Sequence, residues 1–548
     1  MKPRVIRINE ETTDTLQQSL NEKLGLENFQ LYFPALSLWF NYYNNDSYQR
    51  FTLNSEFILK ELGEPLKNEF RDTYIKHMYN SVVVNTKTGE SKETPVFVKM
   101  NPVLDVISYL KNDYNLSNSE TPNIFNFMTN NKINSYHNTA YIDNFFTYIG
   151  SKYLEYNLCP TFPKYYGGFI GITDKYEYDL SEEYNLIQDS NWFTKNLDRL
   201  YKIRVEEFET ELDEKIVFED SSSYPNSNVN LTGTGSGSEC EDDADGYIQD
   251  LKEVLSSEEE GEEEGEGEGE EEGEWETQSE EEAADKEGTE DNSESDNNSI
   301  ISLNSSFEID TQIDKVHYCQ FKRFPVQLVA MEKMEYTLEN LIEDLEHKIT
   351  EDEWFSILFQ ICFGLSVAHK RNKFVHNDLH CSNIMFTETE QEYLYFKYKS
   401  RVFRLPTFGR ITKIIDFGRA TFEVDGNLFF SDVFRKNGDA EGQYSFPYNN
   451  SLKDCKIKPN PSFDLCRLSK TIVEFVDPDS DVFRLLELWT RDKYGNSLLE
   501  HDDDFDLYRI IAKNVRSAVP VKQLEKKVFQ RFIIDESDIP EDTIVYKY

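Results

Sequence analysis

The stretch FVHNDLHCSNIM, residues 374–385, places two histidines, an aspartate and an asparagine between strand-forming apolar residues. Three interpretations are open for it. His376 and His380 could bind a metal ion, but an i, i+4 pair presents two imidazoles together only on a helix, and Asn377-Asp378 does not favour one here. The stretch could also be a polar loop around a core histidine, or a catalytic loop. Its neighbours along the chain distinguish these interpretations.

A helix is predicted directly before this stretch, over ITEDEWFSILFQICFGLSVAHKRNK, residues 349–373. Thr350 and Glu353 form a capping-box pattern, an apolar stripe follows, and basic residues close the segment where the negative end of the helix dipole lies. The run NIMF, 383–386, predicts a short strand. The stretch is therefore a loop between a buried helix and a strand, where side chains can point into a cleft.

A second motif follows at ITKIIDFGRA, residues 411–420. An apolar strand there ends at Asp416, 33 residues after Asn383, and Phe417 and Gly418 come next. The pattern H-x-D-L-x-x-x-N, followed by an apolar strand ending in D-F-G, matches the catalytic loop and metal-binding segment of protein kinases residue by residue. Both motifs in this order are far more specific than either alone. The sequence therefore resembles the protein-kinase-like superfamily.

Phosphoryl transfer explains why these residue types are needed. One carboxylate accepts or orients the proton of the acceptor hydroxyl, while a second carboxylate and an amide oxygen hold Mg²⁺ against the phosphates. The resemblance puts Asp378 in the first role and Asp416 with Asn383 in the second, and it implies ATP and Mg²⁺ as cofactors. His380 joins the candidate catalytic residues, because haspin-like and aminoglycoside-phosphotransferase-like kinases have a histidine where Ser/Thr kinases usually have lysine.

Upstream, two β-branched runs predict a β-hairpin. SVVVN at 81–85 and TPVFVKM at 94–100 flank a polar connection with Gly89 in the turn. The sequence VFVKM resembles the third strand of the small kinase lobe. The resemblance therefore implies that Lys99 contacts the nucleotide phosphates, whereas taken alone it would be an exposed strand lysine.

A helix is predicted at about 138–156, with one apolar face. In the family, a carboxylate on this helix pairs with the lysine of the third strand. Asp143 and Glu155 are both candidates, and Asp143 is favoured because it lies within the helix while Glu155 is near its end.

Two further segments extend the resemblance. PVQLVAMEKM, 325–334, predicts a strand, and Glu332 to Met334 resemble the interlobe hinge, whose backbone would bind adenine. NPSFDLCRLSKTI, 460–472, resembles the long buried helix of the large lobe. Asp464 in it either anchors the backbone of the catalytic loop or is a carboxylate favoured by the dipole at the start of a helix.

The sequence also departs from the family pattern. It lacks G-x-G-x-x-G: FILKELGEPLKNEF, 57–70, resembles the first strand and its loop but contains only Gly63. Fewer backbone amides would then cradle the phosphates. No A-P-E follows D-F-G, and Asn377 stands where many kinases have an arginine that pairs with a phosphate on the activation segment. This neutral residue predicts an enzyme that is active without that phosphorylation.

Charge is distributed very unevenly along the 548 residues. The net charge is −46, and the stretch from Glu239 to Asp296 holds 29 acidic residues against 2 basic ones. Because like charges at this density repel and little can be buried, residues 219–306 are predicted to be a disordered insertion. Basic proteins are its expected partners, and direct nucleic-acid binding is not expected.

Composition also bounds the class of protein. The seven cysteines contain no C-x-x-C pair, which argues against a zinc site or a disulfide framework. No run approaches 18 apolar residues, and the first residues lack the apolar core of a signal peptide. We therefore expect a soluble intracellular protein, in host cytoplasm or a virion if it is viral, with no membrane contact.

The sequence thus predicts an α+β, two-lobed protein-kinase-like fold, most similar to the Ser/Thr kinases predicted for large DNA viruses. The expected parts are an N-terminal extension (1–50), a small lobe (51–334) that contains the acidic insertion, and a large catalytic lobe (335–548). The expected activity is transfer of the ATP γ-phosphate to Ser or Thr of a protein substrate. A small-molecule kinase of the same fold, favoured by His380, and a pseudokinase acting as an acidic scaffold remain alternatives.

Overall fold

The computed structural model describes residues 2–40, 48–66, 77–114, 120–125, 129–211, 311–436, 438–446, 455–501 and 505–548. The chain divides into two compact units, of which one comprises residues 1–206 and 316–548 and the other residues 207–315. The acidic insertion predicted at 219–306 lies outside the described residues. Among the helices in the described ranges, none has the length and apolar character needed to span a bilayer.

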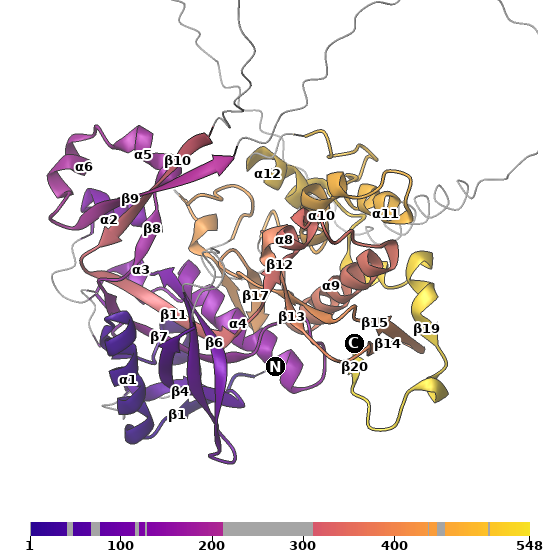
Figure 1. The fold of residues 1–548 in the computed structure, drawn as a ribbon, viewed down its shortest axis with the longest axis horizontal. Helices are drawn as coiled ribbons and strands as arrows, with labels where there is room; N and C mark the ends of the chain where they lie inside the picture. Colours follow the sequence, from indigo (N-terminus) through magenta and orange to yellow (C-terminus); the bar gives the residue numbers. More distant parts are fainter. Residues whose placement is uncertain are drawn as a thin grey trace, which may run out of the picture. The chain divides into compact units, whose positions relative to one another are not determined.

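Six strands form an antiparallel sheet in the order β2-β7-β11-β6-β5-β4 (Figure 1). The strands are β2 (Glu27–Gln30), β4 (Phe57–Pro65), β5 (Met78–Asn85), β6 (Ser91–Pro102), β7 (Tyr165–Thr173) and β11 (Phe324–Glu332). The predicted hairpin is confirmed: β5 and β6 pair from Val84 with Ser91 onward, and Gly89 has the left-handed backbone that the turn requires (φ 74°). The strand predicted at 325–334 is also confirmed, two residues shorter at its end.

Helix α4 (Thr139–Glu155) confirms the prediction for 138–156 and lies against β7 and β11 (Figure 1). Asn138 caps it by accepting a hydrogen bond from the Ala140 N–H. Tyr141, Phe145 and Ile149 of the predicted apolar face are buried, and burial extends around the helix to every residue from 140 to 153. The sheet covers one side of the helix, and aromatic residues that follow Asp416 in the chain pack on another.

Several elements from the described part of the first fifty residues pack onto or beside this sheet. β2 is its edge strand, and α1 (Glu10–Leu24) packs against β4. Asn9 caps α1 at its start, and Gly25 ends it with a left-handed backbone (φ 61°). β1 (Val5–Arg7) pairs with β3 (Phe51–Leu53) beside it. Short helices connect these elements: η1 (Pro34–Leu38), η2 (Tyr48–Arg50), α2 (Val106–Lys111) and α3 (Asn131–Asn134).

A three-stranded sheet of order β8-β10-β9 brackets the undescribed acidic residues. It consists of β8 (Glu177–Asp179), β9 (Tyr201–Glu211) and β10 (Thr311–Phe321), with helices α5 (Ser181–Ile187) and α6 (Asn191–Asn196) between the first two strands. The chain leaves on β9 and returns on the neighbouring β10, and at their base the Lys322 N–H donates to the Leu200 carbonyl at 3.0 Å. β9 and β10 are thus neighbours in one sheet although 99 residues lie between them in the chain.

Deleting residues 220–305 should leave the melting temperature, and the phosphate transfer that the sequence predicts, nearly unchanged. Each halving of a flexible connection lowers its closure cost by only about 0.6 kcal/mol, so the expected change in stability is small and favourable. Thermal unfolding of the deletion variant, compared with a variant that carries a Gly/Ser linker of the original length, measures this. A collapse of the melting temperature in both variants would mean that the segment is structural.

The rest of the chain is mainly helical (Figure 1). Its helices are α8 (Leu338–Glu343), α9 (Glu351–Asn372), α10 (Phe463–Ile472), α11 (Asp481–Trp489), α12 (Phe505–Asn514) and α13 (Pro520–Gln523). α9 confirms the helix predicted at 349–373, and Thr350 caps it by accepting the Glu353 N–H at 3.4 Å. The capping box is only half formed. The Glu353 carboxylate contacts Arg410 at 2.7 Å instead, because a guanidinium is a stronger partner than a backbone amide.

Small sheets complete this part. One sheet contains β12 (Tyr336–Thr337), β13 (Ile384–Glu388) and β16 (Arg410–Ile414). A second has the order β19 (Ile533–Ile534), β15 (Arg401–Pro406), β14 (Tyr393–Tyr398) and β20 (Val545–Lys547). A third is the pair of β17 (Thr421–Val424) and β18 (Asn427–Phe430). Short 3-10 helices are η4 (Cys381–Asn383), η5 (Asp432–Phe434), η7 (Val473–Phe475), η8 (Lys527–Phe532) and η9 (Glu536–Asp538). β13 confirms the predicted NIMF strand, and its register pairs Ile384 with Ile414. Both sequence motifs therefore meet at one end of this strand pair.

Candidate active site

His376 connects the two motifs through its ring. Its Nε2–H donates to the Ile415 carbonyl at 2.8 Å, and its Nδ1 accepts the Asp378 N–H at 3.3 Å. The residue is fully buried, and burial lowers the pKa of the imidazole, which favours this neutral form. Both ring nitrogens bond to backbone, so His376 does not fit the metal interpretation. Within the described ranges, no group of three or more His, Cys, Asp and Glu side chains is arranged to hold a metal ion.

Asp464 anchors the loop that follows Phe374. Its two carboxylate oxygens accept the backbone N–H groups of His376 and Asn377, each at 2.9 Å. Burial raises the pKa of this carboxyl to about 7, and the two N–H donors oppose that rise. Asp464 also lies in the first turn of α10, so the helix-start and anchoring interpretations both apply to it.

Asn377 ties the loop to the segment after Asp-Phe-Gly. Its backbone is left-handed (φ 68°), a conformation that asparagine tolerates better than most residues. Its side-chain amide donates to the Arg419 carbonyl at 2.9 Å and accepts from the Tyr444 hydroxyl at 2.6 Å. Neutral hydrogen bonds of Asn377 therefore connect the loop to this segment.

Asp378 faces a residue from a distant helix. Its Oδ1 accepts the hydroxyl proton of Tyr508 on α12 at 2.8 Å. Its backbone carbonyl accepts from the Asn383 side-chain amide at 2.9 Å, and the same amide nitrogen contacts Nε2 of His380 at 2.9 Å. An N–H donor at that distance requires His380 to accept through Nε2. His380 thus orients Asn383 within the loop.

Lys99 lies between two carboxylates. Its ammonium is 3.0 Å from Oδ2 of Asp143 on α4 and 2.9 Å from Oδ1 of Asp416. Glu155, the other candidate partner, lies elsewhere and contacts Lys152 at 2.6 Å. The structure therefore brings together three residues from the sheet, the helix behind it and the end of β16, although the first and last of them, Lys99 and Asp416, are 317 positions apart in the sequence.

The two charged pairs reinforce one another. Burial lowers the pKa of Lys99, but the carboxylates of Asp143 and Asp416 outweigh this and hold it above its ordinary value. Desolvation raises the pKa of Asp416, and the nearby Lys99 ammonium outweighs that and holds it below its ordinary value. Lys99 and Asp416 are therefore both charged at neutral pH, and the Asp416 side chain is still 47% exposed.

Asp143 also positions the Asp-Phe-Gly turn directly. Its Oδ1 accepts the Phe417 N–H at 2.7 Å, and its Oδ2 accepts from the Asn101 amide at 2.7 Å. The Phe417 ring packs among Phe146 of α4 and Phe374 at the start of the loop, with ring centres 4.9 and 6.0 Å away. Buried aromatic packing and these hydrogen bonds together hold α4, the loop and Asp416 in one arrangement.

This geometry agrees with comparisons to known proteins. No family model matches the sequence. Serine/threonine-protein kinase haspin of Mus musculus is 33% identical over 93 residues, which cover 17% of this chain and 12% of haspin. A predicted serine/threonine-protein kinase of Acanthamoeba polyphaga mimivirus is 36% identical over 201 residues, 29% of this chain and 48% of that protein. Over these segments the chain is similar to proteins named as Ser/Thr kinases.

The matched segments span less than half of these relatives. Haspin of Bos taurus is likewise 32% identical over 118 residues, 18% of this chain and 15% of that protein. The resemblance to Ser/Thr protein kinases, viral ones included, is thus confirmed for these segments. The mixed α+β composition is confirmed as well.

The residues expected to hold magnesium emerge from one end of the β13–β16 pair. The Ile415 N–H donates to the Asn383 carbonyl at 3.1 Å, which places Asn383 beside the residue that precedes Asp416. The Asn383 amide nitrogen is bonded to Asp378, so its amide oxygen is the atom that can contact a cation. A carboxylate and an amide oxygen are hard donors of the kind that Mg²⁺ binds, usually with water and phosphate oxygens as further ligands. The chemistry of this pair fits the ion.

The hinge candidates differ in their surroundings. Glu332 ends β11, and its carboxylate contacts Lys413 at 2.7 Å and accepts the Lys164 N–H at 3.0 Å. The Met334 side chain is buried. The Glu332 side chain is thus engaged in an ion pair, and its backbone N–H donates to the Lys164 carbonyl at 3.0 Å. Gly63 lies in β4, and residues 67–76 after it, including the end of the expected phosphate loop, lie outside the described residues.

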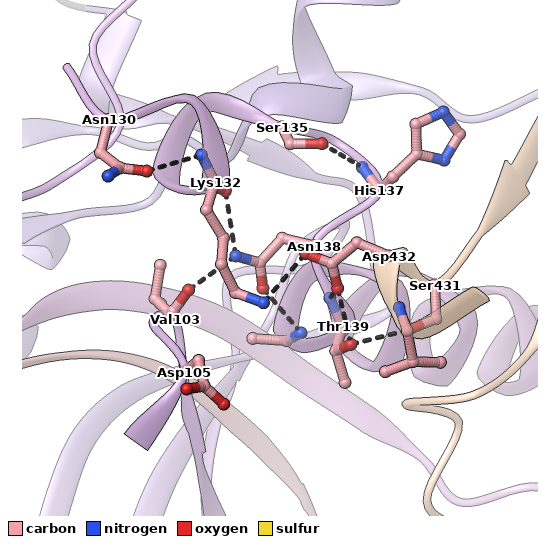
Figure 2. A network of polar contacts seen from close by, with 12 residues as sticks. Val103, Asp105, Asn130, Lys132, Ser135, His137, Asn138, Thr139, Ser431 and Asp432 are labelled. Atoms are coloured by element: carbon pink, nitrogen blue, oxygen red, sulfur yellow. Dashed lines mark hydrogen bonds and ion pairs between the residues drawn. The ribbon is translucent and has the colours of Figure 1, made fainter. Parts of the chain in front are cut away.

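A polar network holds the start of α4 against the segment after Asp-Phe-Gly. Figure 2 shows Asp432 between Thr139 and Lys132. Its Oδ1 accepts from the Thr139 N–H at 3.2 Å and the Thr139 hydroxyl at 3.0 Å, and its Oδ2 is 3.1 Å from the Lys132 ammonium. Asp432 therefore supplies a fixed negative charge at the N-terminus of α4, where the helix dipole favours it.

Sequence reasoning missed several residues of this site. Asn101 could have been found, because it is two positions after Lys99 on the same strand and so shares its face. No sequence pattern near the motifs points to the other missed residues, which are Tyr444, Asp432 and Tyr508. Each of them reaches the site from a separate segment of the chain.

Phosphatase treatment should change the rate of phosphate transfer by less than about threefold, against the roughly 10³-fold scale on which assembly of a phosphoryl-transfer site can act. The segment after Asp-Phe-Gly offers the hydroxyls of Thr421, Ser431 and Ser445 for such a phosphate. Thr421 and Ser431 are fully buried, and Asp432 already provides charge at α4. Transfer rates before and after treatment measure this, with Asp432→Asn as a comparison that should lower the rate more. Activity that disappears on treatment and returns on modification of Ser445 would contradict the prediction.

Proposed function

We propose that this chain is an ATP-dependent phosphotransferase that transfers the γ-phosphate to Ser or Thr hydroxyls of protein substrates. One observation carries the proposal: Lys99 is held between Asp143 and Asp416 while Asp378 lies on the adjoining loop. A scaffold that merely binds partners needs none of these four residues. Their assembly, with relatives named as Ser/Thr kinases, favours catalysis over a pseudokinase role.

Each residue has a distinct role in this proposal. Asp378 accepts or orients the proton of the acceptor hydroxyl as that oxygen attacks phosphorus. Lys99, kept cationic by its two carboxylates, binds phosphate oxygens of ATP, and Asp143 keeps Lys99 in place. Asn383 and Asp416 would hold Mg²⁺, which when bound neutralises charge on the phosphates. His380 fixes Asn383, and backbone at Glu332 to Met334 binds the base.

The two-lobed arrangement is part of the same proposal. The six-stranded sheet with α4 would be the small lobe, within 51–334, and the helical part from 335 to 548 the large lobe. ATP would bind where Lys99 of the sheet meets Asp416 of the β16 end. The acidic residues 219–306 would attract basic protein partners, an attraction that weakens as salt rises beyond the screening range.

Transfer of labelled γ-phosphate from ATP tests the function. We expect incorporation into Ser and Thr of a mixed protein acceptor, dependent on Mg²⁺ and abolished by a chelator. A panel of small hydroxyl compounds, including aminoglycosides, is assayed in parallel. Label on small acceptors alone would identify a small-molecule kinase, and no transfer to any acceptor despite nucleotide binding would identify a pseudokinase.

A further inference from the structure

Tyr508 reaches the proposed catalytic aspartate from 130 positions further along the chain. It lies on α12, and its hydroxyl donates to Oδ1 of Asp378 at 2.8 Å. No motif identified in the sequence contains this tyrosine. The contact therefore adds a helix from the last fifth of the fold to the site.

The Tyr508 hydroxyl also accepts a hydrogen bond from a second residue. Nε of Arg467 donates to the Tyr508 oxygen at 3.0 Å, and Arg467 is largely buried on α10. Arg467 is three residues after Asp464, so both face the loop from the same side of α10. Helix α10 thus fixes the loop twice: Asp464 holds its backbone, and Arg467, through Tyr508, holds the side chain of Asp378.

The ring of Tyr508 is also confined. The guanidinium groups of Arg419 and Arg467 each lie 5.4 Å from its centre, and the Phe463 ring is 5.7 Å away. Burial, together with the charge of Asp378, raises the pKa of Tyr508 above its ordinary value. The hydroxyl therefore keeps its proton at neutral pH and remains a donor.

We propose that Tyr508 is a positioning residue that sets the orientation of the Asp378 carboxylate for phosphate transfer, which rests on the function proposed above. The terminal torsion of an aspartate is broad, so a free carboxylate would sample many orientations. With Oδ1 bonded to Tyr508, Oδ2 is directed to the acceptor hydroxyl. Fixing a reacting group in this way matters because a misplacement of about 1 Å can cost roughly 10²-fold in rate.

Tyr508→Phe removes only the hydroxyl and tests this role. We expect kcat to fall about tenfold or more, while KM for ATP, the affinity for a fluorescent nucleotide and the melting temperature stay unchanged. The matched control is Tyr494→Phe, at a tyrosine that is 73% exposed, and it should leave kcat unchanged. A rise in kcat/KM for Tyr508→Phe would overturn the proposal, because it would show that the tyrosine blocks the acceptor's approach.

A double-mutant cycle separates positioning from general stability. In an Asp378→Asn background, Tyr508→Phe should change the residual rate by less than about twofold, because the residue that it orients is already inactive. Independent, multiplying losses would overturn the proposal. If the wild-type protein transfers phosphate and the Tyr508→Phe variant transfers it equally fast, only the role of Tyr508 is rejected. If the wild-type protein transfers no phosphate, the proposed function is rejected together with this role.

Discussion

Replacing Asp416 by alanine should abolish phosphate transfer while the protein stays folded. The carboxylate is the one charged group proposed to hold magnesium, and its loss leaves phosphate charge uncompensated during transfer. Asp416 is also one of the two ion-pair partners of Lys99. In the variant, Lys99 retains its other partner, Asp143, which lies 3.0 Å away. Labelled-phosphate transfer and thermal unfolding, measured on the same preparations, give both results.

Backbone conformation requires a second variant at this position. Asp416 has a left-handed backbone (φ 62°), where alanine costs roughly 1 kcal/mol and asparagine costs less. Asp416→Asn should therefore melt close to wild type yet transfer no phosphate. Asp425 shares the left-handed backbone (φ 52°) but lies in the turn between β17 and β18, so Asp425→Ala controls for strain and should stay active. Turnover by Asp416→Asn within tenfold of wild type would reject this metal assignment.

Asp378→Asn should lower kcat by at least the roughly 10²- to 10⁴-fold that a lost acid–base group typically costs. Asparagine has the same shape and can still accept the Tyr508 hydroxyl proton through its oxygen, so the loop should keep its conformation. It cannot take up a proton from the acceptor. Nucleotide binding and melting temperature should both match wild type, and unchanged turnover would show that another group performs the proton transfer.

Residues with a chemical signature in a short window could be proposed as candidates from the sequence, as Asp378, Asn383 and Asp416 were. The sequence favoured Asp143 over Glu155 as the partner of Lys99 but contains nothing that decides between them. Twelve residues of helix advance about 18 Å and rotate about 120° from a whole number of turns, so only one of the two can face Lys99. Which one does depends on how α4 packs against the sheet. That is a tertiary property.

Contacts between residues far apart in the sequence could not be predicted from it, for a related reason. The bond from His376 to the Ile415 carbonyl and the bond from Tyr508 to Asp378 join ordinary residue types whose roles arise only from their juxtaposition. The half-formed capping box at Thr350 shows the same effect locally, because Arg410, 57 residues from Glu353, takes the carboxylate that the motif would use. Tertiary partners outcompete local ones when they carry charge.

The neighbouring positions of β9 and β10 have a consequence for how this protein could be built. Because β9 and β10 are hydrogen-bonded neighbours, non-covalent contacts also join the parts of the chain on either side of residues 212–310. Residues 1–211 carry Lys99 and Asp143, and residues 311–548 carry Asp378, Asn383 and Asp416. If the chain were divided at this point, each of the two fragments would hold part of the candidate site. The proposed activity would then depend on reassembly of the fragments, so mixing them would switch it on.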